Sequence, residues 1–302
     1  MATDIIINGE SITLPEPPRT NEEFSSWMDQ GDGYTPVVKL TIRPKLPSGV
    51  YRVVIHQDDY KIVPVELNTD QLYPFSEGFI NTVLTEVEKF WSKADMYEAN
   101  RLVHKRGLLL CGPAGCGKTS LIALLIKQLV EKDGLVFLAR NAEDFGLMIE
   151  AMKFIIREIE PDRPIISVIE DVDKIIDALG SDSDLLTFMD GGLSIDHHMI
   201  ILTSNDTTCL SDALLRPSRI DMRYEIPKPT KAIRKEFFVK KGLSEETAIQ
   251  YANLTNNMSL ADLKEVFIGT QILDKPIDTI ITQLRNPHTN KDYLNTTKKV
   301  NI

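Results

Sequence analysis

The sequence predicts an α/β fold with a parallel sheet, preceded by a small β-rich segment and followed by an all-α unit. Three observations support this prediction. Short apolar, β-branched runs alternate with helical patterns from about residue 75 to residue 229. A glycine-rich loop directly follows one of these runs and opens a helix. After the Pro227-Lys228-Pro229 break, apolar residues recur at helical spacing to about residue 285.

The bulk composition limits the classes of protein. The chain has 302 residues, 42% of them apolar, and a formal net charge of −10. This length predicts two or three domains, and the acidic balance opposes non-specific binding to DNA or acidic lipid. No apolar run reaches the roughly 18 residues that cross a bilayer, and the first ten residues lack the features of a signal peptide. The cysteines Cys111, Cys116 and Cys209 form no CxxC pair, so we expect a soluble cytoplasmic protein.

Residues 1–74 form the predicted β-rich N-terminal domain. The runs VVKLTI, VYRVVIH and YKIVPVEL are short and β-branched, and the turn signals PSG and QDD separate them. A meander or a small barrel is expected. Thr20 and Glu23 fit a capping box before one short helix.

Residues 75–229 form the predicted α/β core. Strands are expected at residues 108–111, 135–139, 165–169, 199–203 and 222–226, with a helix at residues 119–130. A second helix carries an apolar stripe that ends before Pro161: Phe145, Met148, Ile149, Met152, Ile155, Ile156 and Ile159. Residues 230–285 form a predicted helical lid, where Ser259 and Asp262 resemble a capping pair. Residues 286–302 are a polar tail.

The stretch GPAGCGKTS matches the phosphate-binding pattern G-x-x-x-x-G-K-[ST] between a strand and a helix. Its glycines let backbone N–H groups surround phosphates, and the helix N-terminus adds a partial positive charge. Lys118 is expected to reach the β and γ phosphates, and the Thr119 hydroxyl to bind Mg²⁺. A glycine-rich turn with a surface lysine is the less favoured alternative. The predicted nucleotide-binding residues are Gly112, Pro113, Ala114, Gly115, Cys116, Gly117, Lys118, Thr119 and Ser120.

Three carboxylates, Glu170, Asp171 and Asp173, follow the predicted buried strand at residues 165–169. The carboxyl end of such a strand is where a Mg²⁺ ligand and a water-polarising base are needed. A solvated loop is the alternative, and the upstream phosphate loop favours the catalytic interpretation. His197 and His198 beside Asp196 suggest metal ligands, but a solvated turn is favoured.

The stretch ILTSNDTTCLSDALLRPSRIDMRYEIPKP, Ile201 to Pro229, closely resembles the second region of homology of AAA ATPases. KRGLLLCGPAGCGKTS, VIEDVD and DLLTFMDGG resemble further motifs of that family, in the same order and spacing. The resemblance covers about residues 75–285. The Glu-Asp order and the RPSRID ending are most similar to the branch containing the mitochondrial translocase of the Rieske iron–sulfur protein, whose membrane segment we do not find here.

The resemblance implies an ATP-hydrolysing, Mg²⁺-dependent ATPase. It places Asn205 next to the γ phosphate, where its amide orients the attacking water, and Ser259, Leu260 and Ala261 beside the adenine. Arg216 and Arg219 match two arginines that family members project into the neighbouring subunit's nucleotide, which implies a closed homo-oligomeric ring, usually a hexamer. The implied catalytic residues are Lys118, Glu170, Asp171, Asn205, Arg216 and Arg219, and the implied Mg²⁺ ligands are Thr119, Glu170 and Asp171.

Three features depart from the family pattern. The usual carboxylate order is Asp then Glu, whereas this chain has Glu170 then Asp171, so a shorter base must hold the water closer or hydrolysis is slow. Ser218 stands where glycine is usual. Phe145 followed by Gly146 is the only trace of the aromatic pore loop that threads polypeptides, and Phe145 fits the core stripe better. Threading is therefore not expected.

Three functions remain open from the sequence. The first is an ATP-driven remodeller of a protein partner, with the N-terminal domain as its substrate adaptor. The second is a nucleic-acid loader or packaging accessory, which the net acidity and the lack of a basic stripe oppose. The third is a slowly hydrolysing, nucleotide-gated scaffold, which the Glu-Asp order suggests.

Overall fold

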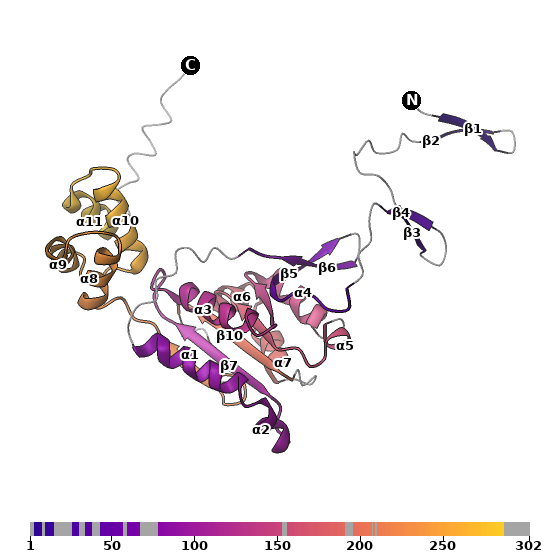
Figure 1. Ribbon diagram of the computed structural model, residues 1–302, viewed down its shortest axis with the longest axis horizontal. Coiled ribbons are helices and arrows are strands. Elements are labelled where there is room, and N and C mark those ends of the chain that lie inside the picture. The colour runs from indigo at the N-terminus through magenta and orange to yellow at the C-terminus, as the bar shows by residue number, and fades with distance from the viewer. Residues whose placement is uncertain are drawn as a thin grey trace. The chain divides into compact units, whose positions relative to one another are not determined.

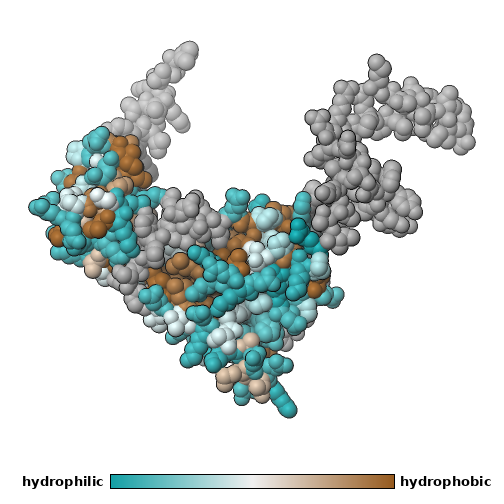
Figure 2. All heavy atoms as spheres, viewed as in Figure 1, coloured by the Kyte–Doolittle hydropathy of each residue, from teal (hydrophilic) through white to brown (hydrophobic). Residues whose placement is uncertain are grey.

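The computed structural model describes residues 43–56, 59–66, 78–152, 156–190, 196–206, 208 and 210–286, and the backbone of four strands within residues 3–37. The chain divides into two compact units, Met1–Leu46 and Pro47–Ile302. Figure 1 shows the elements of each unit, and Figure 2 shows that hydrophilic residues cover most of the described surface on one face. The predicted tail lies outside the described residues, except Asn286.

The described strands of the first unit form two antiparallel pairs. Strand β1 (Thr3–Ile7) pairs with β2 (Glu10–Leu14), and β3 (Ser26–Asp29) pairs with β4 (Tyr34–Val37). The expectation of β-rich structure holds for these segments. The prediction of a short helix after Thr20 is wrong for Ser26–Asp29, because the backbone there forms β3 and pairs with β4. Thr20 and Glu23 themselves lie outside the described residues.

The second unit is built on a seven-stranded sheet in the order β11-β7-β10-β9-β8-β5-β6. All pairs are parallel except β5 with β6. Strands β8, β9 and β10 are buried along their whole length, as strands covered on both faces must be. The predicted α/β class is confirmed. The strands are β5 (Gly49–His56), β6 (Asp59–Pro64), β7 (Lys105–Cys111), β8 (Leu135–Ala139), β9 (Ile165–Ile169), β10 (His198–Ser204) and β11 (Met222–Glu225).

The hairpin β5–β6 corrects the predicted domain boundary at residue 74. Val50 pairs with Val136 of β8, and the rings of Tyr51 and Phe137 lie 6.1 Å apart. Residues 49–64 therefore extend the core sheet instead of belonging to an N-terminal domain, and the division falls between Leu46 and Pro47. The β-branched pattern correctly indicated strands, but it does not specify which strand they pair with.

Helices cover both faces of the sheet (Figure 1). Helices α1 and α3 contribute Val83, Val87, Leu121 and Leu125 to the hydrophobic cluster that lies against one face. On the other face, Phe145 of α4 packs edge to face on Phe188 of α7 at 5.9 Å. The helices of this core are α1 (Gly78–Trp91), α2 (Ala94–Ala99), α3 (Lys118–Val130), α4 (Ala142–Ala151), α5 (Arg157–Ile159), α6 (Val172–Leu179) and α7 (Ser183–Asp190).

The core role favoured for Phe145 is confirmed, since its side chain is 1% exposed. Within the stripe that contains it, the backbone changes from α-helical to π-helical at Met152 and is again π-helical at Ile156, before α5 begins. Helix α4 ends at Ala151, and Met152 and Ile156 remain buried. Ile159 is 62% exposed, so its assignment to the core stripe is wrong.

Up to Asn286, where the described part of the chain ends, four helices follow the sheet: α8 (Lys231–Lys240), α9 (Glu245–Leu254), α10 (Leu260–Gln271) and α11 (Ile277–Arg285). They enclose a core of their own that includes Phe237, Phe238, Leu263 and Ile280. The predicted capping pair is confirmed: the Ser259 side chain accepts from the Asp262 N–H, and the Asp262 side chain accepts from the Ser259 N–H. This reciprocal capping pair fixes the first residue of α10.

Candidate nucleotide site

The loop between β7 and α3 has the backbone geometry of a phosphate-binding loop. Gly112 has a φ of +140°, and a Cβ there would lie 2.2 Å from the carbonyl oxygen of Ile226. Gly115 has a φ of +73°, and a Cβ there would lie 2.8 Å from the Cβ of Ala261. A side chain at either position would therefore be strained by its backbone and by its neighbour.

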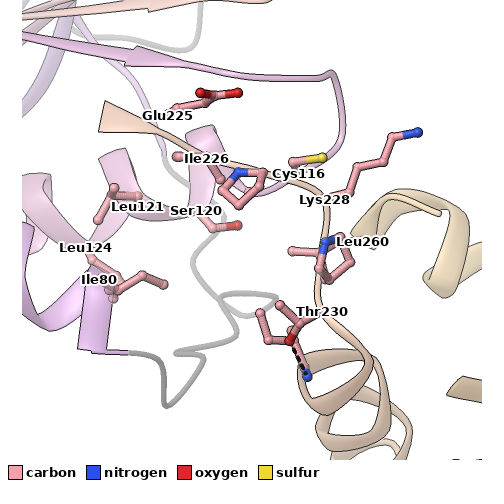
Figure 3. Close-up of a pocket in the computed structure, with 14 residues that line it drawn as sticks. Ile80, Cys116, Ser120, Leu121, Leu124, Glu225, Ile226, Lys228, Thr230 and Leu260 are labelled. Carbon is pink, nitrogen blue, oxygen red and sulfur yellow. Dashed lines mark hydrogen bonds between the residues drawn. The ribbon is translucent and has the colours of Figure 1, made fainter. Parts of the chain in front are cut away.

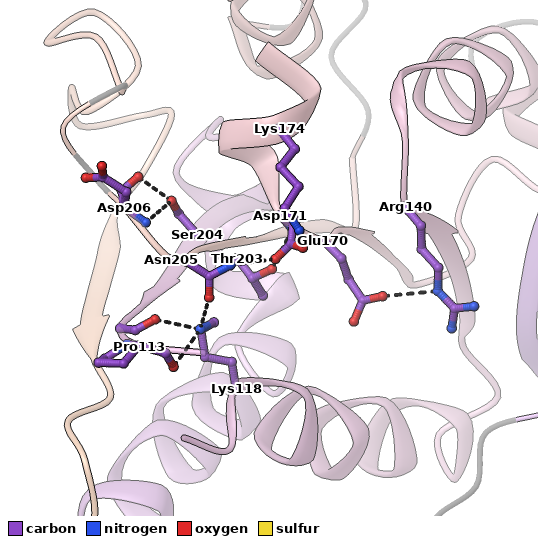
Figure 4. Close-up of polar contacts among 11 residues, drawn as sticks. Pro113, Lys118, Arg140, Glu170, Asp171, Lys174, Thr203, Ser204, Asn205 and Asp206 are labelled. Carbon is purple, nitrogen blue, oxygen red and sulfur yellow. Dashed lines mark hydrogen bonds and ion pairs between the residues drawn. The ribbon is translucent and has the colours of Figure 1, made fainter. Parts of the chain in front are cut away.

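Lys118, the first residue of α3, turns back over this loop (Figure 4). Its Nζ donates to the carbonyl oxygens of Gly112 at 2.6 Å and Pro113 at 3.1 Å, and to Oδ1 of Asn205 at 2.7 Å. Burial lowers the pKa of Lys118, while the nearby Asp171 carboxylate raises it. The ammonium group thus lies at the carboxyl edge of the sheet, in contact with the predicted water-orienting asparagine.

Asn205 and Asp171 extend the same polar row from the neighbouring strands β10 and β9. The Asn205 amide donates to Asp171 Oδ1 at 3.1 Å. The backbone of Asp171 has a φ of +50°, and its N–H donates to Thr203 Oγ1 at 2.8 Å. Lys174 of α6 pairs with the other Asp171 oxygen. Lys118, Asn205 and Asp171 are therefore connected by direct hydrogen bonds.

A cavity of about 410 Å³ lies in front of this row. It is lined by Ala114, Gly115, Gly117, Lys118, Thr119, Ser120, Asp171, Lys174, Asn205, Phe237, Leu260, Ala261 and Lys264. The N–H of Ala261 donates to the Gly115 carbonyl at 3.2 Å, which brings the start of α10 onto the loop. Sequence reasoning missed Lys174, Phe237 and Lys264. Lys264 lies one helical turn after Ala261, and that spacing could have indicated it.

A second cavity, of about 280 Å³ and mostly apolar, adjoins the first and shares Gly117, Ser120 and Leu260 with it (Figure 3). Burial raises the pKa of the Cys116 thiol, so its side chain stays neutral at ordinary pH. A flat, weakly polar group is the kind of ligand that such walls suit. The remaining lining residues are Ile80, Cys116, Leu121, Leu124, Glu225, Ile226, Pro227, Lys228, Pro229, Thr230 and Ile233.

The three predicted metal ligands do not all line the same cavity. Thr119 and Asp171 line the larger cavity, and their hydroxyl and carboxylate oxygens are the hard donors that Mg²⁺ prefers. Glu170 does not line it; its Oε2 lies 3.1 Å from Arg140 Nε. Asp173 has a buried Oδ1 with no hydrogen-bond partner among the described residues. Within that part of the chain no cluster of three His, Cys, Asp or Glu side chains is poised for a metal.

The two histidines that were weighed as metal ligands lie in different surroundings. His198 is buried, and its Nε2 lies 2.9 Å from Ser167 Oγ. His197 places its Nδ1 3.2 Å from Nδ1 of His104. The partners are the buried residues Ser167 of β9 and His104, so the two histidines do not face a common site.

Asp221 and Gly107 hold the loop that carries the two predicted arginine fingers. Asp221 Oδ2 accepts from the Gly107 N–H at 3.0 Å, and Oδ1 accepts from the Ser218 N–H at 2.9 Å. A Cβ on Gly107 would lie 1.6 Å from the carbonyl oxygen of Arg219. Ser218 has a φ of +74°, which explains why glycine is usual at its position in the family it resembles.

The two arginines differ in their surroundings. Arg219 pairs with Asp190 through two nitrogens and donates to the Ala213 carbonyl. This guanidinium lowers the pKa of the Asp190 carboxyl. Arg216 is exposed and makes no side-chain hydrogen bond or ion pair within the described ranges. Neither arginine lines the larger cavity of its own chain.

The fold and the site define a P-loop nucleotide-binding domain: a buried strand, a glycine loop with its lysine, and a helix, facing polar groups on adjacent parallel strands. Residues 108–228 match the family described as "ATPase family associated with various cellular activities (AAA)". These residues therefore form an AAA ATPase domain, as the resemblance predicted.

Three relatives illustrate this similarity. The "Probable mitochondrial chaperone bcs1" of Schizosaccharomyces pombe is 28% identical over 219 residues, which cover 68% of this chain and 47% of that protein. The "AAA ATPase forming ring-shaped complexes" of Corynebacterium diphtheriae is 26% identical over 187 residues, 53% of this chain and 36% of that protein. The "Proteasome-activating nucleotidase" of Saccharolobus islandicus is 29% identical over 245 residues, which cover 72% of this chain and 58% of that protein. The chain thus spans less than two thirds of the length of each of these relatives.

None of the helices in the described residues has the length and apolar character that a membrane crossing requires.

Proposed function

We propose that this protein binds ATP and hydrolyses it to ADP and phosphate. The observation that carries the proposal is the connected row of Lys118, Asn205 and Asp171 beside the P-loop cavity. A lysine, an amide and a carboxylate at the ends of adjacent strands are the groups that bind a triphosphate and orient a water against it. The AAA family match agrees with this chemistry.

The two cavities suggest how the nucleotide lies. The phosphates face the loop glycines and the N-terminus of α3, where backbone N–H groups and Lys118 supply positive charge. The base enters the apolar cavity between Leu121, Ile226 and Ile233. Gly117, Ser120 and Leu260 line both cavities, so a nucleoside triphosphate can extend from one into the other.

Hydrolysis requires a water to attack the γ phosphorus as the bond from that phosphorus to the β–γ bridging oxygen breaks. Asn205 orients the water, Asp171 accepts its proton, and Lys118 offsets the charge on the phosphate oxygens. ADP leaves with the bridging oxygen. Thr119 and Asp171 are the residues that would hold Mg²⁺, and when bound this ion neutralises phosphate charge.

The exposed Arg216 supports a site completed by a second copy of the chain. A guanidinium stabilises charge on the transferring phosphoryl group, yet Arg216 does not line the cavity of its own chain. A neighbouring copy in a closed ring would bring Arg216 to that cavity, and the name of one relative describes ring-shaped complexes. We propose a homo-oligomeric ring, with a hexamer as the expected form. Arg219, held by Asp190, positions this loop.

The ring would act on a protein partner. Relatives named as a mitochondrial chaperone and a proteasome-activating nucleotidase support a protein client over a nucleic acid, as does the net charge of −10. The hairpin unit Met1–Leu46 is separate from the ATPase unit, and we propose it as the adaptor. The free thiols of Cys111 and Cys116 suit a reducing compartment, so we place the protein in the cytoplasm.

One observation favours a slowly hydrolysing scaffold as the second candidate. Both Asp171 oxygens are engaged, one by Asn205 and one by Lys174. Neither oxygen can then accept a proton from an attacking water until one of these two contacts breaks. A nucleotide-gated scaffold would bind ATP in the same way and release phosphate slowly or not at all.

Two measurements separate these functions: binding of a fluorescent ATP analogue, and phosphate release from ATP with Mg²⁺. Lys118→Ala should abolish both, whereas Lys127→Ala, on the exposed side of the same helix, should change neither. Asp171→Asn should keep binding and lose phosphate release. Wild-type binding without phosphate release would favour the scaffold. Binding that survives Lys118→Ala unchanged would contradict both.

A further inference from the structure

Lys174 lies at one end of the polar row beside the phosphate loop. Its Nζ pairs with one Asp171 oxygen, and the Asn205 amide donates to Asp171 Oδ1 at 3.1 Å. Lys118 Nζ in turn donates to Asn205 Oδ1 at 2.7 Å. Figure 4 shows that the two lysines approach this row from opposite sides, Lys174 from α6 and Lys118 from α3. A ligand in the cavity in front of the row therefore meets an ammonium group at each end.

The position of Lys174 in α6 is unfavourable for the helix itself. Lys174 is the third residue of α6, in the first turn, where the helix has a partial positive charge and repels a cation. A Glu or Gln at this place would instead complete a capping box. The N-cap Asp171 has a φ of +50° and makes no side-chain capping bond, so its carboxylate is available to the lysine. A residue that breaks a local preference in this way is expected at a functional site.

The lining of the phosphate cavity is net positive. The described residues that line it include three lysines, Lys118, Lys174 and Lys264, and one carboxylate, Asp171. The hydrogen bond to Asp171 raises the pKa of Lys174, so its amine carries a proton at neutral pH. A flexible lysine that faces such a cavity is suited to bind phosphate oxygens.

Lys174 lines only the larger of the two adjoining cavities. Gly117, Ser120 and Leu260 line both, whereas Lys174 and Asp171 line the larger one alone. With the base in the apolar cavity, the α and β phosphates lie nearest the shared residues. The γ phosphate is then the group that reaches Lys174, and a diphosphate ends before it.

We propose that Lys174 is a specificity-determining residue that binds the γ phosphate, so that the chain prefers a nucleoside triphosphate to the corresponding diphosphate. The inference rests on the proposed function, in which the phosphates occupy the larger cavity. When a triphosphate binds, the Lys174 ammonium exchanges an Asp171 oxygen for a γ-phosphate oxygen. A diphosphate has no oxygen at this place, and Lys174 stays with Asp171.

The exposure of the pair sets the size of this preference. The Lys174 side chain is 69% exposed and that of Asp171 is 35% exposed. Separating so exposed an ion pair costs at most about fivefold in an equilibrium constant, whereas a lysine–phosphate hydrogen bond contributes about tenfold or more. Lys174 should therefore favour the triphosphate by about three- to tenfold.

The test is equilibrium binding of ATP and ADP that carry the same fluorescent dye on the ribose, measured on the full chain in EDTA. Without Mg²⁺, hydrolysis does not interfere and Asp171 has no metal to hold. The measured quantity is the dissociation constant of ADP divided by that of ATP. Lys174→Ala and Lys174→Gln should each lower this ratio by about three- to tenfold, and Lys174→Arg should keep most of it because the charge remains.

Lys132→Ala is the matched control. Lys132 Nζ lies 3.4 Å from Glu88 Oε1 in another exposed ion pair, and Lys132 lines neither cavity. Removing this lysine also breaks a pair with a carboxylate, but it should leave the ratio unchanged because no phosphate reaches it.

The decisive comparison uses the Asp171→Asn background. Asp171→Asn alone should raise the ratio by up to about fivefold, because no ion pair has to separate, and adding Lys174→Ala should lower it again. An unchanged ratio in Lys174→Ala, including an equal loss of ATP and ADP binding, would overturn the inference. A fall that disappears in the Asp171→Asn background would also overturn it, since Lys174 would then only neutralise the carboxylate. A wild-type chain that binds neither labelled nucleotide would instead refute the proposed function.

Discussion

Replacing Asp221 with alanine should remove the support of the arginine loop. Its carboxylate accepts from the buried Gly107 N–H at 3.0 Å and from the exposed Ser218 N–H at 2.9 Å. Leaving the buried donor without an acceptor costs about 1–3 kcal/mol, and loss of the exposed bond about 0.5 kcal/mol. We therefore expect Asp221→Ala to lower the free energy of unfolding by about 1.5–3.5 kcal/mol, and Asp221→Asn, which keeps one acceptor, by less.

Urea denaturation with an unchanged m-value measures this loss. Asp212→Ala is the matched control, because Asp212 is an exposed carboxylate in the same segment with no hydrogen bond among the described residues; its effect should stay within about 0.5 kcal/mol. The same Asp221→Ala protein should bind nucleotide with wild-type affinity but hydrolyse it more slowly, since Arg216 loses its fixed position. An Asp221→Ala stability within about 0.5 kcal/mol of wild type would refute the reasoning.

Three further changes have defined outcomes. Ser218→Gly should raise the melting temperature, because Ser218 has a φ of +74° that costs a non-glycine residue about 1 kcal/mol; a drop would contradict this. Gly115→Ala places a methyl group 2.8 Å from the Ala261 Cβ, so nucleotide binding should weaken several fold and Ala261→Gly should partly restore it in the double variant. Burial lowers the pKa of His104 below its ordinary 6.5, so the unfolded chain takes up its proton first. The free energy of unfolding should be highest above pH 6.5 and should fall as the pH drops through that value. His104→Gln should therefore flatten the plot of melting temperature against pH between about pH 7.5 and about pH 5.5. The same slope in the variant and the wild type would exclude His104 as the cause.

Local signals in the sequence predicted the centre of the fold well. Uncharged β-branched runs gave β8 and β9 with their observed bounds, because a strand buried on both faces tolerates few other residues. The phosphate loop and the start of α3 follow from glycine and lysine spacing alone. The placement of Lys118 against Asn205 also follows, since the loop that leads to Lys118 and the residue Asn205 follow the neighbouring strands β7 and β10.

Pairings between distant segments could not be predicted. The sequence pattern predicts strands within residues 49–64. Their place beside β8, however, depends on pairing with a segment that lies more than 80 residues further along the chain. The same holds for Arg140: a lone arginine after a strand gives no signal of its carboxylate partner. Glu170 and Asp171 are adjacent in sequence and chemically alike, so only the tertiary structure separates their partners, Arg140 and Asn205.

The central claim is that ATP is hydrolysed in a site that two copies of the chain complete. Mixing wild-type protein with Arg216→Ala at constant total concentration, and measuring phosphate release against the fraction of wild type, tests it most directly. A shared site predicts activity that falls faster than the wild-type fraction, because a wild-type site is impaired whenever its neighbour lacks the arginine. Activity strictly proportional to the wild-type fraction would contradict the claim.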